Sequence, residues 1–286
     1  MAGKERPSRS SKFVIIGILV IVTYVTPWLI IGIWHWSVVA FDWSTKNDIS
    51  YIVFISVCAA AWVTSFHLWS RVSRLEEGKI RKLFLMTGFT FVVIVGIFTY
   101  MIINTMEPWF GFPSITGSIN AAIPEIDFKL FGLIQIRMPA DSIVTFALLL
   151  LAITFYIYPM EKYVKQKLPW HTISMLICTA IIPLLLVARN SEILLSIGTF
   201  GVVLWVLYNF VFLFYLYFSL GISAPTGTPL RRASILIGVG LLFIIFVWIA
   251  QWAIYTGTLL LDFAIQMSFG AASFLCFNYG YYLINK

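Results

Sequence analysis

The chain has 286 residues, of which 60% are hydrophobic, 17% aromatic and only 11% charged, and its net charge is +7. A soluble domain carries about 25% charged residues because its surface must face water. The composition therefore excludes a water-soluble globule and indicates a protein embedded in lipid. With 18 Gly, 11 Pro and 3 Cys, the chain is neither collagen-like nor a disulfide-rich secreted scaffold.

Long apolar stretches predict the fold. A helix needs about 20 apolar residues to cross ~30 Å of hydrocarbon. Windows of this size predict an all-α integral membrane protein, a bundle of eight transmembrane helices, with seven spans as the alternative because the fifth is short and the sixth is long. The expected spans are 13–34, 50–70, 83–105, 141–159, 172–188, 193–221, 233–256 and 258–283.

Basic residues predict the orientation of the bundle, because loops rich in Lys and Arg stay in the cytoplasm. The basic segment 1–12 precedes the single transmembrane domain 13–286, and the loops 71–82 and 160–171 share its side and its charge. We therefore expect a multi-pass protein of the cell membrane with both termini cytoplasmic. This placement fits contact with anionic lipid headgroups and gives no reason to expect nucleic-acid binding.

A sparse internal similarity relates 13–159 to 172–283. Thr23 and Pro27 in span one align with Thr179 and Pro183 in span five. Two interpretations stay open: a parallel repeat of four plus four spans, as in some transporters, and a chance match between apolar helices.

The segment 107–139, expected outside the cytoplasm, is longer than a connection requires. Apolar and polar residues alternate between Ile126 and Met138, on both sides of Phe131 and Gly132. This pattern predicts a small β-hairpin or an extended flap. Such a flap serves either as a lid over a binding site or as a cap on the lipid surface.

Small side chains recur every four residues in span eight, and such stripes let membrane helices approach closely. We expect this stripe to pack on another helix, either within the bundle, in a second copy of the chain or in a different protein. Its members are Ala264, Ser268, Ala272, Cys276 and Gly280.

Charged residues near the outer boundary form the first candidate site. Asp262 lies inside span eight, and a carboxylate within a membrane is costly unless it is paired or hydrated. Its expected partner is Arg189, and His35, Asp141 and Glu192 complete a predicted outer polar cluster for ligand binding. The alternative is that all five residues simply meet water and headgroups.

Uncharged polar residues lie nearer the middle of the bilayer. They are Asn209 and Tyr208 in span six, Gln251 in span seven and Gln266 in span eight. Such groups form hydrogen bonds between helices, and a solute pathway would use the same residues.

Catalytic and metal-binding patterns are not recognised in the sequence. His35 is expected at the outer face, and His67 and His171 at the inner face, so no three-histidine metal site is predicted. No nucleophile stands beside a credible base, and no glycine-rich phosphate loop follows a strand. We therefore expect no catalytic residues, no metal and no cofactor.

The sequence thus favours a receptor-like or accessory membrane subunit. It would sense a ligand or lipid at its outer face or dock onto a larger membrane complex. Two alternatives remain: an uncoupled or weakly coupled transporter of an apolar or zwitterionic solute, and a lipid-modifying enzyme at the outer interface.

Overall fold

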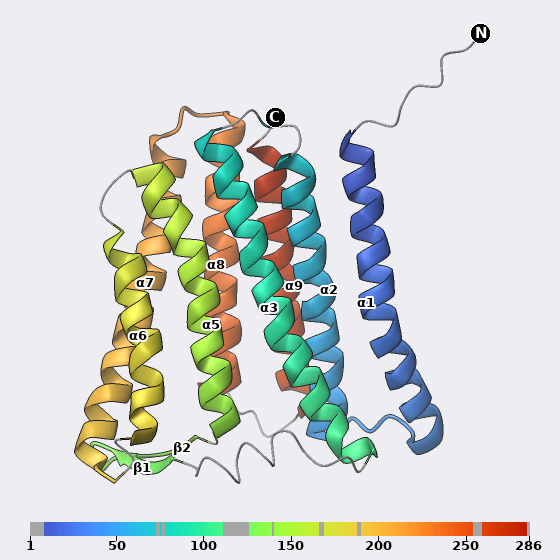
Figure 1. Cartoon of the computed structure of the whole chain (residues 1–286), viewed down its shortest axis with the longest axis vertical. Helices are drawn as coiled ribbons and strands as arrows, with labels where there is room; N and C mark the ends of the chain where they lie inside the picture. The colour runs from blue at the N-terminus through green and yellow to red at the C-terminus, as the bar shows by residue number, and fades with distance from the viewer. Residues whose placement is uncertain are drawn as a thin grey trace. The chain divides into compact units, whose positions relative to one another are not determined.

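The computed structural model describes residues 9–72, 75, 78–110, 126–138, 140–165, 169–187, 190–253 and 259–284. This part of the chain is mainly helical (Figure 1). Its helices are α1 (Arg9–Val39), α2 (Lys46–Val72), α3 (Lys79–Phe110), α5 (Ala140–Pro159), α6 (Trp170–Val187), α7 (Glu192–Ser223), α8 (Pro229–Ala253) and α9 (Leu259–Leu283), with a π-helical turn, η1 (Met160–Lys165), directly after α5.

The helices coincide with the stretches that hydropathy selects, and each expected span overlaps one of them. Among the described residues, five helical segments are long and apolar enough to cross a membrane: Ile18–Val39, Asn47–Val72, Lys79–Phe110, Glu192–Ser223 and Pro229–Val247. The structure is therefore consistent with an all-α membrane protein. Its many exposed Leu, Ile, Val and Phe side chains are the surface expected to face lipid.

A two-stranded antiparallel sheet lies between α3 and α5 in the chain. Strand β1 (Ile126–Leu130) pairs with β2 (Ile134–Met138), and the register places Asp127 opposite Arg137. Phe131 and Gly132 in the turn have φ values of 50° and 73°. The alternating segment thus folds as a hairpin, while the rest of the predicted flap, 107–139, is described only in part.

The chain divides into two compact units. Unit 1 contains Met1–Ile102 and Phe214–Lys286, and unit 2 contains Ile103–Leu213. Unit 1 thus combines the first helices with α8 and α9. The predicted repeat of 13–159 and 172–283 concerns internal similarity rather than contacts and stays a prediction.

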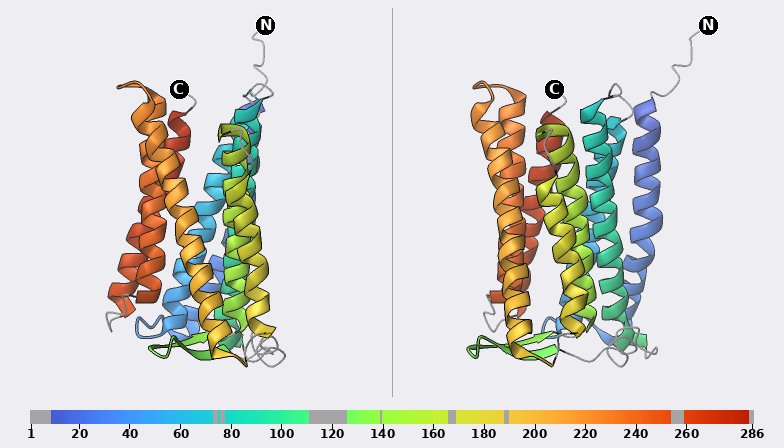
Figure 2. Two further views of the ribbon diagram at one scale, coloured as in Figure 1. Left: turned by 90° about the vertical axis from the view of Figure 1, so that its left-hand side faces the viewer. Right: turned by 60° about the vertical axis from the view of Figure 1, so that its left-hand side comes forward.

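Close helix contacts define unit 1. Helix α1 packs on α2, and α9 packs on both α2 and α8 (Figure 2). At Gly280 of α9, a Cβ atom would lie 2.7 Å from Ile237 Cγ1 and 3.1 Å from the Ala233 carbonyl oxygen. At Gly240 of α8, it would lie 3.1 Å from the Ser273 carbonyl oxygen. Glycine therefore permits the approach of α8 and α9 at these two positions.

Unit 2 contains the hairpin, α5, η1, α6 and most of α7. Helix α5 packs on α6, and the hairpin lies at the end of the unit where α7 begins (Figures 1 and 2). Phe128 of β1 is only 1% exposed, so one face of the hairpin is packed against the unit.

Candidate functional site

Three polar clusters lie among the described residues, and each joins two helices within one unit. The α1–α2 cluster contains His35, Asp42 and Asp48, and the α2–α9 cluster contains Thr64, His67 and Asn278. Unit 2 holds the α6–α7 cluster, which contains Glu161, His171, Thr172, Ser174 and Asn209.

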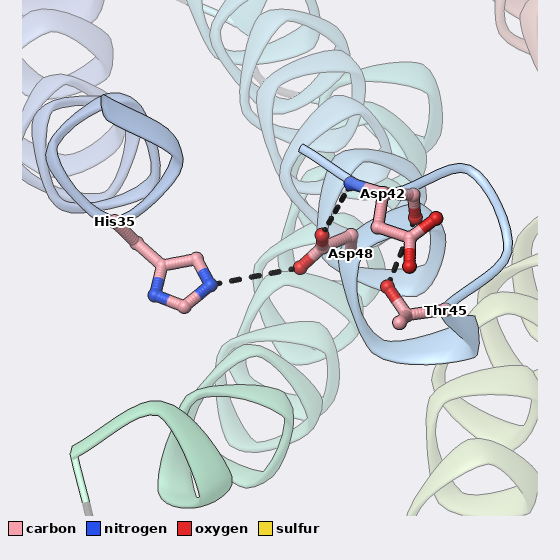
Figure 3. Close-up of polar contacts among 4 residues, drawn as sticks. All are labelled: His35, Asp42, Thr45 and Asp48. Carbon is pink, nitrogen blue, oxygen red and sulfur yellow. Dashed lines mark hydrogen bonds and ion pairs between the residues drawn. The ribbon is translucent and has the colours of Figure 1, made fainter. Parts of the chain in front are cut away.

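In the α1–α2 cluster, His35 near the end of α1 faces Asp48 in the first turn of α2 (Figure 3). The distance from His35 Nε2 to Asp48 Oδ1 is 3.8 Å, and the two residues are 7% and 4% exposed. The carboxylate also accepts a hydrogen bond from the Asp42 backbone N–H, at 2.9 Å to Oδ2. Its position in the first turn of a helix further stabilises its negative charge.

The connection between α1 and α2 is built around Asp42. Its backbone carbonyl accepts a hydrogen bond from the Thr45 hydroxyl at 2.9 Å, and its carboxylate accepts the Ser44 hydroxyl and N–H at 2.7 and 2.8 Å. The two hydrogen bonds from Ser44, first the one from its side chain and then the one from its backbone, lower the pKa of the exposed Asp42 carboxyl. The connection is therefore an ordered turn that holds the Asp42 backbone N–H in position to donate to Asp48.

Aromatic rings pack together at the same ends of α1 and α2. Trp36 contacts Phe41 and Tyr51 edge to face, with centroid distances of 4.8 and 5.9 Å, and Phe41 contacts Trp43 at 4.6 Å. The Tyr51 hydroxyl donates to the Trp28 carbonyl of α1. Aromatic contacts thus join α1, the connection and α2 at the ends that carry His35 and Asp48.

The α6–α7 cluster centres on Asn209, which has no exposed surface. Asn209 Oδ1 lies 3.1 Å from His171 Nδ1, and its amide donates to the Trp205 carbonyl at 2.8 Å and to the Ser174 hydroxyl at 3.4 Å. Because the amide group is the donor to the other two partners, His171 donates from Nδ1 to Oδ1.

The His171 ring lies against two aromatic rings of α7. Its centroid is 3.5 Å from that of Phe212 and 5.2 Å from that of Tyr208, with interplanar angles of 10° and 19°. Stacking and the hydrogen bond to Asn209 together fix the orientation of the imidazole.

Glu161 in η1 supplies a buried carboxylate to the same cluster. It is 3% exposed and accepts the backbone N–H groups of His171 and Thr172, each at 2.8 Å, and the Thr172 hydroxyl at 2.7 Å. The first N–H groups of a helix have no partner within the helix, so Glu161 caps α6.

The α2–α9 cluster repeats part of this arrangement in unit 1. Asn278 Oδ1 lies 3.2 Å from His67 Nδ1, while its amide donates to the Thr64 hydroxyl at 2.9 Å and the Phe274 carbonyl at 3.0 Å. One turn from His67, Arg71 lies over the Tyr282 ring at 5.0 Å from its centroid.

The predicted outer polar cluster is described only in part. His35 is buried beside Asp48, a partner that the sequence did not predict, and Glu192 is exposed in the first turn of α7. Asp141 and Asp262 lie in α5 and α9, but their side chains, like that of Gln251 in α8, are outside the described part, as is Arg189 altogether. The predicted pair of Asp262 and Arg189 therefore stays a prediction.

Other predicted residues are placed directly. Tyr208 is 54% exposed, while Gln266 is half-buried in α9. Along the predicted stripe of α9, Ala264 and Ser268 are exposed, Ala272 and Cys276 are half-buried, and Gly280 is buried. Cys276 and Gly280 face α8, so the end of the stripe nearest the C-terminus packs within unit 1.

Within the described residues, no group of three or more His, Cys, Asp or Glu is arranged to hold a metal ion. No protein-family model, curated protein or solved structure matches this chain. The three clusters are therefore interpreted from their geometry alone: the α6–α7 and α2–α9 clusters are hydrogen-bonded junctions between helices, and the α1–α2 cluster joins its helices through the contact of His35 with Asp48.

Proposed function

We propose that the chain is a receptor-like or accessory subunit of the cell membrane that works through non-covalent contacts. In this proposal it is a bundle of eight spans with both termini in the cytoplasm. It senses a ligand or lipid at its outer face or docks onto a larger membrane complex.

The observation that carries the proposal is that Asn209 is completely buried and fully hydrogen-bonded to protein groups. A solute pathway through the bundle would need this polar group near the middle of α7, yet it has no exposed surface, and its oxygen and its amide both bond to protein groups. A polar group used in this way holds helices together. This favours a receptor-like or accessory subunit over a transporter.

The α1–α2 cluster supports the choice of the outer face for sensing. The His35 and Asp48 pair links two helices next to an ordered connection, so a ligand bound at residues 40–45 would act directly on the α1–α2 junction. Trp34 and Trp43 are 54% and 48% exposed near this connection, as interfacial anchors are.

Impermeant thiol labelling tests the orientation. Ser44→Cys in the α1–α2 connection should react with reagent added outside cells, whereas Thr226→Cys between α7 and α8 should react only after the membrane is opened. Reaction of Thr226→Cys in intact cells would contradict the proposed topology.

Native mass spectrometry tests the function. The protein is purified from its native membrane in a gentle detergent, and every co-migrating polypeptide and small molecule is identified. We expect a stoichiometric protein subunit or lipid that survives Ser223→Ala, an exposed control at the end of α7, and declines several-fold in Asp48→Asn. A lone chain that takes up solute in proteoliposomes, with uptake abolished by Asn209→Leu, would instead establish the transporter alternative.

A further inference from the structure

The turn of the β1–β2 hairpin has an unusual sequence for its backbone. Phe131 and Gly132 both have positive φ, and the Leu133 N–H donates to the Leu130 carbonyl at 3.0 Å. Asn and Gly are the residues that normally occupy two such positions, because a bulky side chain is strained there. A large apolar ring at the first position therefore has a use that outweighs its backbone cost.

Helix α7 holds this turn in place. The buried Ser196 hydroxyl accepts the Phe131 N–H at 3.2 Å and donates to the Lys129 carbonyl at 3.3 Å. The Phe131 ring also packs edge to face on Phe200, with centroids 5.5 Å apart. The hairpin turn is thus fixed beside the second and third turns of α7.

The turn leaves two large apolar side chains exposed. Leu133 is 85% exposed and Phe131 54% exposed, although Phe128 in the same hairpin is buried. In water such a tip would be unfavourable. A solvent of hydrocarbon or headgroups would remove that penalty.

The exposed tip is continuous with a surface that is expected to face lipid. Helix α7 is one of the membrane-spanning candidates, and Phe200, which touches Phe131, is itself 45% exposed. Nearby on α7, Ile193 and Ile197 are 72% and 59% exposed. The side chains of Asp127 and Lys129 are exposed on the strand face opposite Phe128, where they suit the water outside the headgroups.

From this geometry we propose that the hairpin tip, formed by Phe131 and Leu133, is an interfacial anchor that inserts into the lipid monolayer beside the first turns of α7. Its partner is a lipid surface, and the hairpin is a lipid-surface cap rather than a lid over a binding site. Ser196 then fixes the depth of α7 relative to the membrane boundary.

Spin labels on the full chain in lipid nanodiscs test this proposal. Leu133→Cys, Asp127→Cys and Ile197→Cys are made in a background in which Cys58, Cys178 and Cys276 are replaced by Ala. Collision with oxygen, which concentrates in lipid, is compared with collision with a water-soluble nickel chelate. Ile197 is the matched lipid control, and Asp127 is the matched aqueous control on the same hairpin.

We expect the oxygen-to-nickel ratio at Leu133 to approach that at Ile197 and to exceed that at Asp127 several-fold. A ratio at Leu133 equal to that at Asp127 would overturn the proposal, because the tip would then lie in water. Protection of Leu133 from both reagents would also overturn it, because protein would then cover the tip as a lid or an interface does.

Discussion

The α6–α7 and α2–α9 clusters both join two helices through a histidine and an asparagine side chain. In each, a histidine Nδ1 meets an asparagine Oδ1, and the asparagine amide bonds to a hydroxyl and to the carbonyl four residues earlier. They differ in their surroundings. His171 is stacked on two aromatic rings, and its backbone N–H donates to the buried Glu161. In unit 1, α9 instead approaches α8 closely at glycine. The α6–α7 cluster therefore has the larger set of buried polar contacts, and the helix that carries Asn278 also depends on close approach at glycine.

The strongest test of this difference removes the Glu161 carboxylate. Glu161→Ala should destabilise unit 2 by about 3 kcal/mol, because two backbone N–H groups and one hydroxyl lose a buried acceptor. Glu161→Gln keeps one acceptor oxygen and should lose roughly half as much. Thermal unfolding in detergent, followed by tryptophan fluorescence, measures both. Equal stability of Glu161→Ala and the exposed control Glu192→Gln would show that α6 needs no such cap.

The corresponding test of unit 1 uses two glycines of α9. Gly280→Ala should destabilise by about 1 to 3 kcal/mol, since its methyl group would overlap Ile237 and crowd the Ala233 carbonyl. Gly270→Ala is the matched control, because nothing lies within 4 Å of a Cβ atom there. It should be neutral or slightly stabilising. If both variants unfold alike, close approach of α8 and α9 is not what stabilises unit 1.

Double-mutant cycles compare the two histidine and asparagine pairs directly. His171→Phe with Asn209→Leu should show a coupling of about 1 kcal/mol, and His67→Phe with Asn278→Leu about half of that. The difference is expected because Asn209 is completely buried and Asn278 only half-buried. Equal couplings, measured by unfolding in detergent, would remove the distinction between the two clusters.

The smallest expected effect concerns the exposed α1–α2 connection. The pKa of Asp42 is lowered from its usual 3.8, so its contribution to stability is present above that pH and lost as the pH falls through the lower folded value. Wild type should therefore lose slightly more stability than Asp42→Asn on acidification from about pH 5 to about pH 3. The two unfolding curves are recorded in the same buffers, and parallel losses would show that Ser44 gives this carboxylate no advantage.

Hydropathy and alternation were sufficient to locate the elements, because both are local properties of the chain. The expected spans 13–34 and 193–221 fall within α1 and α7, and the alternation around Gly132 marks the turn of the hairpin. Whether eight helices cross the membrane, and in which direction, stays a prediction. The partition into two units was not foreseen, since apolar periodicity does not specify which helices are neighbours.

The sequence predicted one cluster around Asp262, but the three clusters that the structure describes were anticipated only as single residues. Asn209 was singled out as a polar group but was not paired with His171, because tertiary packing and not the local sequence decides that α6 and α7 are neighbours. Asp48 was overlooked although a signal existed: a short connection makes α1 and α2 antiparallel, so residues at similar distances from the turn face each other. Glu161 was treated as part of a charged loop, and only its depth in the fold reveals the helix cap.

The sequence separation of the two histidine and asparagine pairs has a consequence for how the protein is made. His171 and Asn209 are 38 residues apart, so their link can form soon after α7 leaves the ribosome. His67 and Asn278 are 211 residues apart, and Thr64 and Asn278 are 214 apart, so this junction must wait for α9. Until then, His67 of α2 lacks its asparagine partner. The α2–α9 cluster therefore forms late in synthesis, and a product truncated before α9 would lack this junction.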